Sequence, residues 1–251
     1  MLSAVVRVGP ATLTPRRIHA ALIPEQWFRV VQTPVPGEAG GERETGWLVV
    51  LQRRSEVTGT PGVEVEARWH ILAPDRKSVD DSVGAYFASD DTRYEQWLVT
   101  TTRRTLLPDG REDPDSPPMT TQETGTRSGG TVEIKLEQTG KGAMPLTFAK
   151  PPSGYLPQAY VWLLPSILPA DEPAGYGFYW YNATMRSMTY RHDRVEPALD
   201  RFTIHTRLSP TEEETESTYD ATRATLERRL SPALKLLPST NAELQRLWPG
   251  G

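Results

Sequence analysis

The sequence predicts a mainly β protein, a curved antiparallel sheet (half-barrel or sandwich) of roughly ten strands with one or two short helices. Apolar and polar residues alternate with a period of two over several segments, which is typical of strands with one wet face. The 23 prolines and 19 glycines among 251 residues supply frequent turns. No helix-sized crossover separates successive strands, so neighbours are expected to pair antiparallel.

The clearest alternation covers residues 63–72, where the side chains from Val63 to Ile71 are apolar on one side and those from Glu64 to His70 are polar on the other. The same pattern recurs in two further segments, residues 132–137 and 202–208. Runs rich in Thr, Val, Trp and Tyr predict the other strands, at residues 26–32, 46–54, 94–105, 177–191 and 216–229, the last bent midway. Breaks are expected at residues 34–41, 59–62, 108–118 and 125–130.

Helix signals are few. Ser239 or Thr240 is expected to cap a short C-terminal helix, which would carry Leu244, Leu247 and Trp248 onto the core. A second helix, short and buried between two groups of strands, is predicted within residues 155–168, where Pro157 and Pro165 limit its length. Residues 14–22 are expected to form a turn or short helix.

The chain is predicted to be a single β-rich domain over residues 1–251, with residues 150–154 as the place where a weak boundary would fall. Such a length buries enough surface to fold without a metal or disulfide. The loop at residues 108–118 is rich in Pro and Asp and has no apolar anchor, which predicts local disorder.

Composition excludes several classes of protein. The net charge of −4 and the pI of about 5.7 do not fit a nucleic-acid binder. Basic pairs, such as Arg103-Arg104 and Arg228-Arg229, are interpreted as part of solvated strand faces. The absence of cysteine removes disulfides, thiol nucleophiles and zinc thiolate sites.

The first residues match a secretory signal peptide poorly, since Arg7 and Pro10 interrupt their apolar stretch. No segment approaches the roughly 20 apolar residues that span a bilayer, so a soluble protein without a transmembrane segment is expected. The compartment stays open, with a periplasmic or extracellular location slightly favoured.

No catalytic motif is found, and no catalytic residue, metal site or cofactor is predicted. His70 and His205 lie on the polar faces of alternating strands and are expected to be exposed. His192 is interpreted as part of a turn at a strand end. The acidic segment at residues 109–115 departs from the calcium loop of a helix-loop-helix site, and a solvated hairpin loop is preferred there.

Aromatic residues crowd the predicted strand at residues 177–191, where both faces are aromatic. Such a strand is either central in the core or lines a cavity on one side. If it lines a cavity, the preceding segment would add three further aromatic residues. The ligand-binding candidates are therefore Tyr155, Tyr160, Trp162, Phe178, Tyr179, Trp180 and Tyr181.

The order of elements resembles that of bacterial periplasmic half-barrel proteins of the LolA-like lipoprotein-carrier kind. The similarity lies in successive antiparallel strands, a Pro-flanked apolar segment at residues 156–169 and closing strands around residues 219–229. It concerns architecture over about half of the chain and includes no specific motif. The resemblance implies a curved sheet that holds lipid or acyl chains in its concave face.

Three functional hypotheses follow. The first is a non-enzymatic binding protein that holds an apolar small molecule, a lipid-like ligand or a lipidated protein in the concave face of the sheet. The second is a structural or interaction β-sandwich module of a larger envelope or surface assembly. The third is a glycan-active hydrolase with a carboxylate pair, so enzymatic activity stays open although its absence is favoured.

Overall fold

The computed structural model describes residues 5–7, 22–34, 41–148, 150–208 and 213–248, and all strands in these ranges join one 15-stranded sheet. The predicted mainly β, antiparallel fold class is thereby confirmed, with more strands than expected. The predicted element at residues 14–22 lies outside the described residues apart from its last residue. So does most of the predicted break at residues 34–41.

The sheet consists of two meanders. The first contains β2 (Glu25–Gln32), β3 (Arg43–Val57), β4 (Thr60–Leu72), β5 (Ser78–Ser89), β6 (Glu95–Thr105), β7 (Met119–Ser128), β8 (Thr131–Gln138) and β9 (Lys141–Phe148). The second contains β10 (Ala174–Asn182), β11 (Ser187–Pro197), β12 (Arg201–Arg207), β13 (Thr215–Asp220), β14 (Thr225–Ser231) and β15 (Leu234–Ser239). The last strand, β15, pairs with β2, so the two meanders form one continuous surface.

A short strand, β1 (Val5–Arg7), pairs parallel with β10. Every other pairing between described strands is antiparallel, as the short connections require. The described sheet therefore ends at β1 on one side and at β9 on the other.

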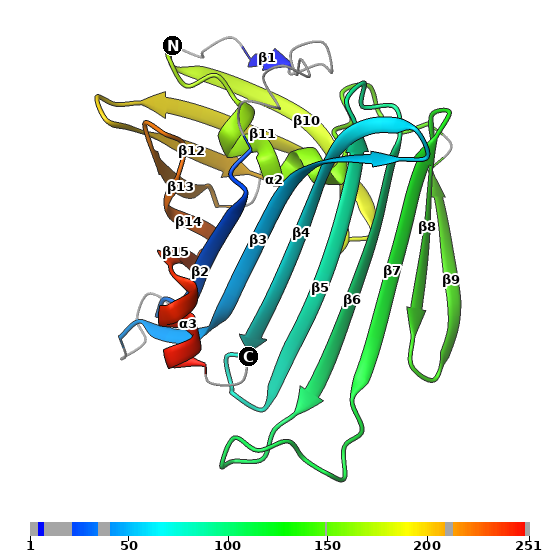
Figure 1. Ribbon diagram of the computed structural model, residues 1–251, viewed down its shortest axis with the longest axis vertical. Coiled ribbons are helices and arrows are strands. Elements are labelled where there is room, and N and C mark those ends of the chain that lie inside the picture. Colours follow the sequence, from blue (N-terminus) through cyan, green and yellow to red (C-terminus); the bar gives the residue numbers. More distant parts are fainter. Residues whose placement is uncertain (1–4, 8–21, 35–40, 149, 209–212, 249–251) are drawn as a thin grey trace.

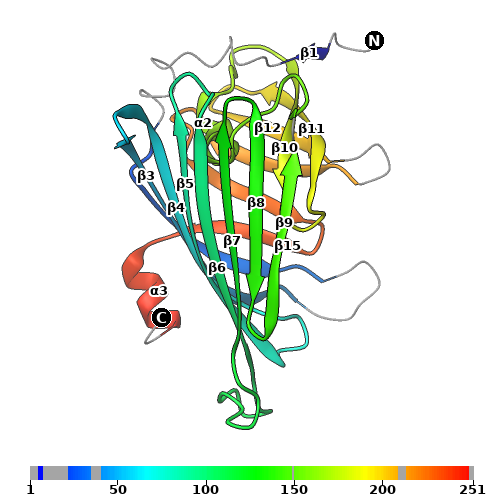
Figure 2. The same cartoon turned by 90° about the vertical axis from the view of Figure 1, so that its right-hand side faces the viewer.

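The sheet curls around a helix, α2 (Gln158–Ile167), which connects the two meanders (Figure 1). Strands β10 to β13 run steeply across the direction of β3 to β8, and α2 lies inside the curl (Figure 2). Nine of the ten residues of α2 are buried, and Tyr160, Leu163 and Leu164 have no exposed surface. Each such side chain contributes about 1.5–3 kcal/mol on burial. The predicted buried helix is thus confirmed.

A distant carboxylate caps the N-terminus of α2. Pro157 occupies the N-cap position and offers no side-chain hydrogen bond. Instead Glu95 on β6 accepts a hydrogen bond from the backbone N–H of Gln158, at 2.9 Å from Oε2. Negative charge at a helix N-terminus is favourable. Glu95 is nevertheless fully buried, and this burial raises its pKa to about 7. Tyr155, the Gln158 amide and Arg127 act in the opposite direction and lower the pKa.

The second described helix, α3 (Asn241–Leu247), lies on the outer face of the sheet beside β2. Thr240 caps it as predicted, accepting a hydrogen bond from the Glu243 amide. Leu244 is buried against the sheet, whereas Leu247 is 36% exposed, so the prediction for Leu247 is wrong. In the described part of the chain, neither helix is long and apolar enough to cross a bilayer.

Two predicted strands are in fact hairpins. Residues 177–191 divide into β10 and β11, separated by a turn in which Asn182 Oδ1 accepts hydrogen bonds from the amides of Thr184 and Met185. This turn contains neither Gly nor Pro, so its side-chain hydrogen bonds replace the usual sequence signal. Residues 216–229 likewise divide into β13 and β14.

Both histidines expected on exposed faces are covered, and that prediction is wrong. His70 stacks on Trp47 with ring centroids 6.0 Å apart, meets Trp248 edge-on and lies 2.7 Å from Asp81. His205 is only 7% exposed. Long side chains on neighbouring strands, together with Trp248 just after α3, cover the face that alternation marks as polar.

Two other sequence interpretations also differ from the structure. His192 lies in the middle of β11 and pairs with Gly177, not at a strand end. The loop at residues 108–118 forms turns, in which the amide of Leu107 donates to the carbonyl of Arg111 and Gly110 donates back to Leu107. Asp109 is tied to Arg111 in the same loop.

We expect Glu95→Gln to change the pH dependence of stability. A folded-state pKa of about 7 exceeds the ordinary value of 4.5, so the folded protein binds this proton more tightly than the unfolded chain. The resulting stabilisation is complete below pH 4.5 and is lost as the pH rises to about 7, with an upper limit of about 3 kcal/mol. Glu95→Gln keeps a neutral acceptor for the Gln158 amide and removes this loss.

Urea unfolding from about pH 5 to about pH 8 measures the effect. The stability of Glu95→Gln relative to the unsubstituted protein should rise across that range. The exposed Glu133 on β8 provides the control, since Glu133→Gln should show no such trend. Parallel pH curves for Glu95→Gln and the unsubstituted protein would contradict the assignment.

Candidate functional site

A cavity of about 490 Å³ opens in the concave face of the second meander, beside the C-terminal end of α2. Its size falls within the range of small-molecule sites. The wall combines apolar side chains with hydroxyl groups and with four charged residues, which are Arg191, Glu213, Arg228 and Arg229. The residues that matter here are Pro165, Trp180, Arg191, Ile204, Arg228 and Leu230.

Sheet register explains why these side chains share one face. Residues directly opposite each other on antiparallel strands project to the same side. Phe178 on β10 lies opposite Arg191 on β11, and Ser217 on β13 lies opposite Arg228 on β14. Phe178 and Ser217 belong to the buried inner face, so both arginines point into the concave side of the sheet.

Arg191 is neutralised within the wall. Its Nε lies 2.9 Å and 3.0 Å from the two carboxylate oxygens of Asp193, and its Nη2 donates to the hydroxyl of Thr206. Thr206 in turn donates to Asp193 at 2.6 Å. Asp193 has no exposed surface, and the Arg191 guanidinium also lies over the ring of Phe178. This triad is a fixed part of the wall.

Arg228 has a different environment. Among the described residues, it makes no hydrogen bond or ion pair with any side chain or carbonyl. Its guanidinium lies over the ring of Trp162 on α2, 5.5 Å from the centroid. Although the side chain keeps some exposure to the cavity, burial lowers the pKa of Arg228. Arg191 acts in the same direction, and Tyr219 and Asp193 oppose it.

The seven sequence-predicted ligand residues fall into two groups. Trp180 lines the cavity, and Trp162 borders it through Arg228; both are half-buried. The other five residues fill the interior or lie away from the cavity. They are Tyr155, Tyr160, Phe178 and Tyr181, exposed by at most 4%, and Tyr179, which packs against Tyr190.

Specific contacts fix the buried tyrosines. The hydroxyl of Tyr160 donates to the carbonyl of Ser89 at 2.9 Å, and that of Tyr181 donates to Glu123 at 3.1 Å. Glu123 also accepts a hydrogen bond from the indole of Trp97. Burial raises the pKa of Tyr160 and Tyr181, so these hydroxyls stay protonated donors.

Sequence reasoning missed Arg191 and Arg228 as cavity residues. The pair Arg228-Arg229 was interpreted as part of a solvated face, yet adjacent residues on a strand point to opposite faces. One member therefore has to face inward. Both residues border the cavity, but the Arg229 side chain forms an ion pair with Glu227 at 3.3 Å, whereas the Arg228 guanidinium lies over Trp162 inside the curl.

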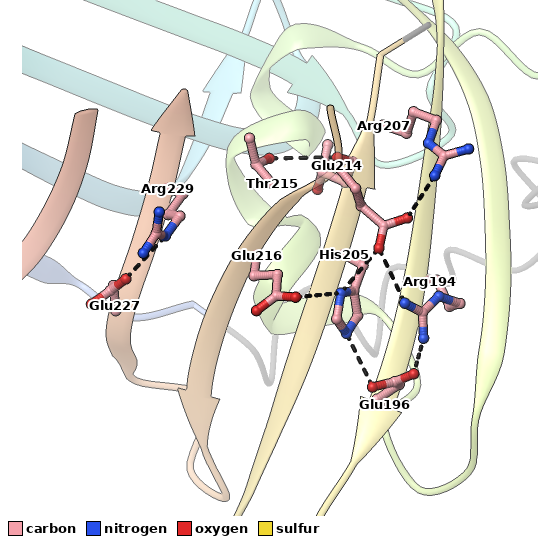
Figure 3. Close-up of polar contacts among 10 residues, drawn as sticks. Arg194, Glu196, His205, Arg207, Glu214, Thr215, Glu216, Glu227 and Arg229 are labelled. Carbon is pink, nitrogen blue, oxygen red and sulfur yellow. Dashed lines mark hydrogen bonds and ion pairs between the residues drawn. The ribbon is translucent and has the colours of Figure 1, made fainter. Parts of the chain in front are cut away.

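The outer face of the same strands carries an ion network (Figure 3). His205 on β12 lies 3.1 Å from Glu196, 3.2 Å from Glu214 and 3.4 Å from Glu216. Arg194 and Arg207 pair with the carboxylates around it. Throughout the described part of the chain, no group of three His, Cys, Asp or Glu residues is arranged to hold a metal ion.

Comparison with known proteins supports the fold. No protein-family model matches the sequence, and no curated protein matches it. Among solved structures, the chain is similar to the crystal structure of a beta-barrel-like protein of a domain of unknown function, DUF1849, from Brucella abortus. The TM-score is 0.53 at 11% sequence identity, over 86% of this chain and 94% of that chain. At this identity the likeness shows the fold alone.

We expect Asp193→Asn to be strongly destabilising. The substitution keeps the shape of the side chain but leaves the Arg191 guanidinium, 13% exposed, without its anion. Breaking a buried pair in this way costs about 3–5 kcal/mol. Adding Arg191→Met should recover most of this loss, and denaturant unfolding of the two variants measures both effects.

The exposed pair of Arg103 and Asp80 provides the matched control, because its side chains are 54% and 31% exposed. Asp80→Asn should cost less than about 1 kcal/mol. Equal losses for Asp80→Asn and Asp193→Asn would refute a structural role for the buried pair.

Proposed function

We propose that the protein is a non-enzymatic binding protein that holds an apolar or lipid-like ligand in the concave face of its sheet. The observation that carries this proposal is the cavity beside α2, whose wall is largely apolar and is left uncovered by the helix. Ligand sites are concave, mostly apolar and furnished with few polar groups.

Two wall residues support an apolar occupant. Leu230 is 44% exposed although it lines the cavity, and the half-buried Trp180 lies in the same wall. Apolar surface in a concave site gains about 25 cal/mol for each Å² that a ligand removes from water. The wall is therefore suited to an alkyl chain or a ring system.

The architecture adds a second line of support. The order of elements resembles LolA-like carriers, which hold acyl chains in the concave face of a curved sheet, and the cavity here also lies in a concave face. The beta-barrel-like neighbour from Brucella abortus has no function in its description. The proposal therefore depends on the cavity itself.

Binding of the neutral fluorescent probe N-phenylnaphthylamine tests the proposal. We expect saturable binding that Leu230→Asn weakens about tenfold, which corresponds to about 1.4 kcal/mol of lost apolar contact. Leu98 on β6 offers a matched control, since it is 41% exposed but lies outside the cavity. Leu98→Asn should leave the affinity within about twofold.

Native mass spectrometry of the freshly purified protein, followed by solvent extraction, identifies any ligand that copurifies. Absence of probe binding and of an extracted molecule would count against the binding function. Equal effects of Leu230→Asn and Leu98→Asn would place the probe elsewhere than in this cavity.

A further inference from the structure

We propose that the ligand is an amphiphile with an anionic head group and that Arg228 binds this head group. This inference rests on the proposed binding function and specifies the chemical class of the ligand. The observation behind it is a cationic side chain in the wall of an apolar cavity, without a counter-ion among the described residues.

The other charged groups of the wall are accounted for. Arg191 is neutralised by Asp193 at 2.9 Å, and Arg229 pairs with Glu227 at 3.3 Å. Glu213 lies exposed at the rim and forms no ion pair with Arg228. Among the described residues of the wall, Arg228 is therefore the arginine that forms no ion pair.

A positive charge in a largely apolar wall is unfavourable unless an anion binds to it. A charge that is partly removed from water loses hydration, and an opposite charge with hydrogen bonds restores it. The planar guanidinium matches the oxygen pairs of a carboxylate or phosphate and binds them with two parallel hydrogen bonds. Contact with the face of Trp162 keeps the guanidinium in place at 5.5 Å.

The surroundings of Arg228 indicate where the rest of the ligand lies. Leu230 lies two residues further along the strand, next to a β-bulge between Arg229 and Ser231, and it also lines the cavity. Pro165, Trp180 and Ile204 complete the apolar wall. A ligand whose head group is bound by Arg228 can thus place its hydrocarbon chain against these residues. A purely apolar ligand would leave Arg228 without an anion, and a purely polar anion would leave the apolar wall uncovered.

Three ligands with the same alkyl chain test the inference: dodecanol, dodecanoate and dodecyl phosphate. Displacement of N-phenylnaphthylamine at neutral pH reports their affinities. We expect both anions to bind at least tenfold more tightly than dodecanol, and their order to distinguish a carboxylate from a phosphate head group. Equal affinity of all three would overturn the head-group assignment while supporting the apolar site. Failure of all three to displace bound probe, or to bind at all, would overturn the proposed function as well.

Variants assign the effect to one residue. Arg228→Gln should remove the preference for anions and leave the affinity for dodecanol within about twofold. Arg201→Gln is the matched control, since Arg201 on β12 is 59% exposed and lies outside the cavity lining, and it should retain the full preference. An anion preference that survives Arg228→Gln would exclude Arg228 as the head-group residue.

If Arg228→Gln does not fold, Arg228→Lys keeps the charge and removes the planar fork. Reduced preference for both anions in Arg228→Lys would support the assignment, and an unchanged preference would contradict paired hydrogen bonding by Arg228.

The salt dependence of dodecanoate binding to the unsubstituted protein gives an independent readout: affinity should fall with salt for dodecanoate but not for dodecanol.

Discussion

The burial of α2 inside the curled sheet is the interaction on which the rest of the structure depends. A sheet needs a second apolar layer against one face, and here one short helix supplies it for most of the core. Tyr160, Leu163 and Leu164 lose all exposed surface in this contact. Hydrogen bonds distant in sequence help to hold the helix, among them one from the Gln158 amide to Glu95 and one from the Tyr160 hydroxyl to Ser89.

The cavity follows from the length of this helix. Helix α2 has ten residues and ends at Ile167, and the carbonyl of the C-cap residue Leu168 accepts a hydrogen bond from Arg223 at 2.6 Å. Beyond that point the concave face of the second meander lacks a covering helix. In that part of the sheet Leu230 stays 44% exposed, and the Arg228 guanidinium lies over the ring of Trp162.

Much of the fold could be predicted from period-two alternation, because one face of most strands contacts the core and the other contacts water. Prediction failed where that contrast was weak. Strand β5 was not predicted because Asp80 and Asp81 interrupt its apolar pattern. Both aspartates form ion pairs with arginines on the adjacent strand β6. Gly125 was interpreted as a breaker, yet it lies within β7, where the ring of Trp97 occupies the space of a side chain.

The candidate site could be predicted only in part. Aromatic residues on both faces of residues 178–181 correctly indicated that both faces contact protein, and Trp180 does line the cavity. Arg191 and Arg228 were not predicted as cavity residues because a basic residue in a strand is normally solvated. Their inward direction depends on strand register, which sequence alternation does not specify for a segment such as residues 225–231, with charged residues on both faces.

The pairing of β15 with β2 has a consequence for the order in which the protein folds. Within each meander neighbouring strands are close in sequence, but this seam joins Ser239 to Trp27. Contacts between residues about two hundred positions apart require closure of a long loop and form slowly. Each meander can therefore assemble early by local pairing, and the seam joins them last. The seating of α2 against both meanders is then a property of the completed chain and not of either half during synthesis.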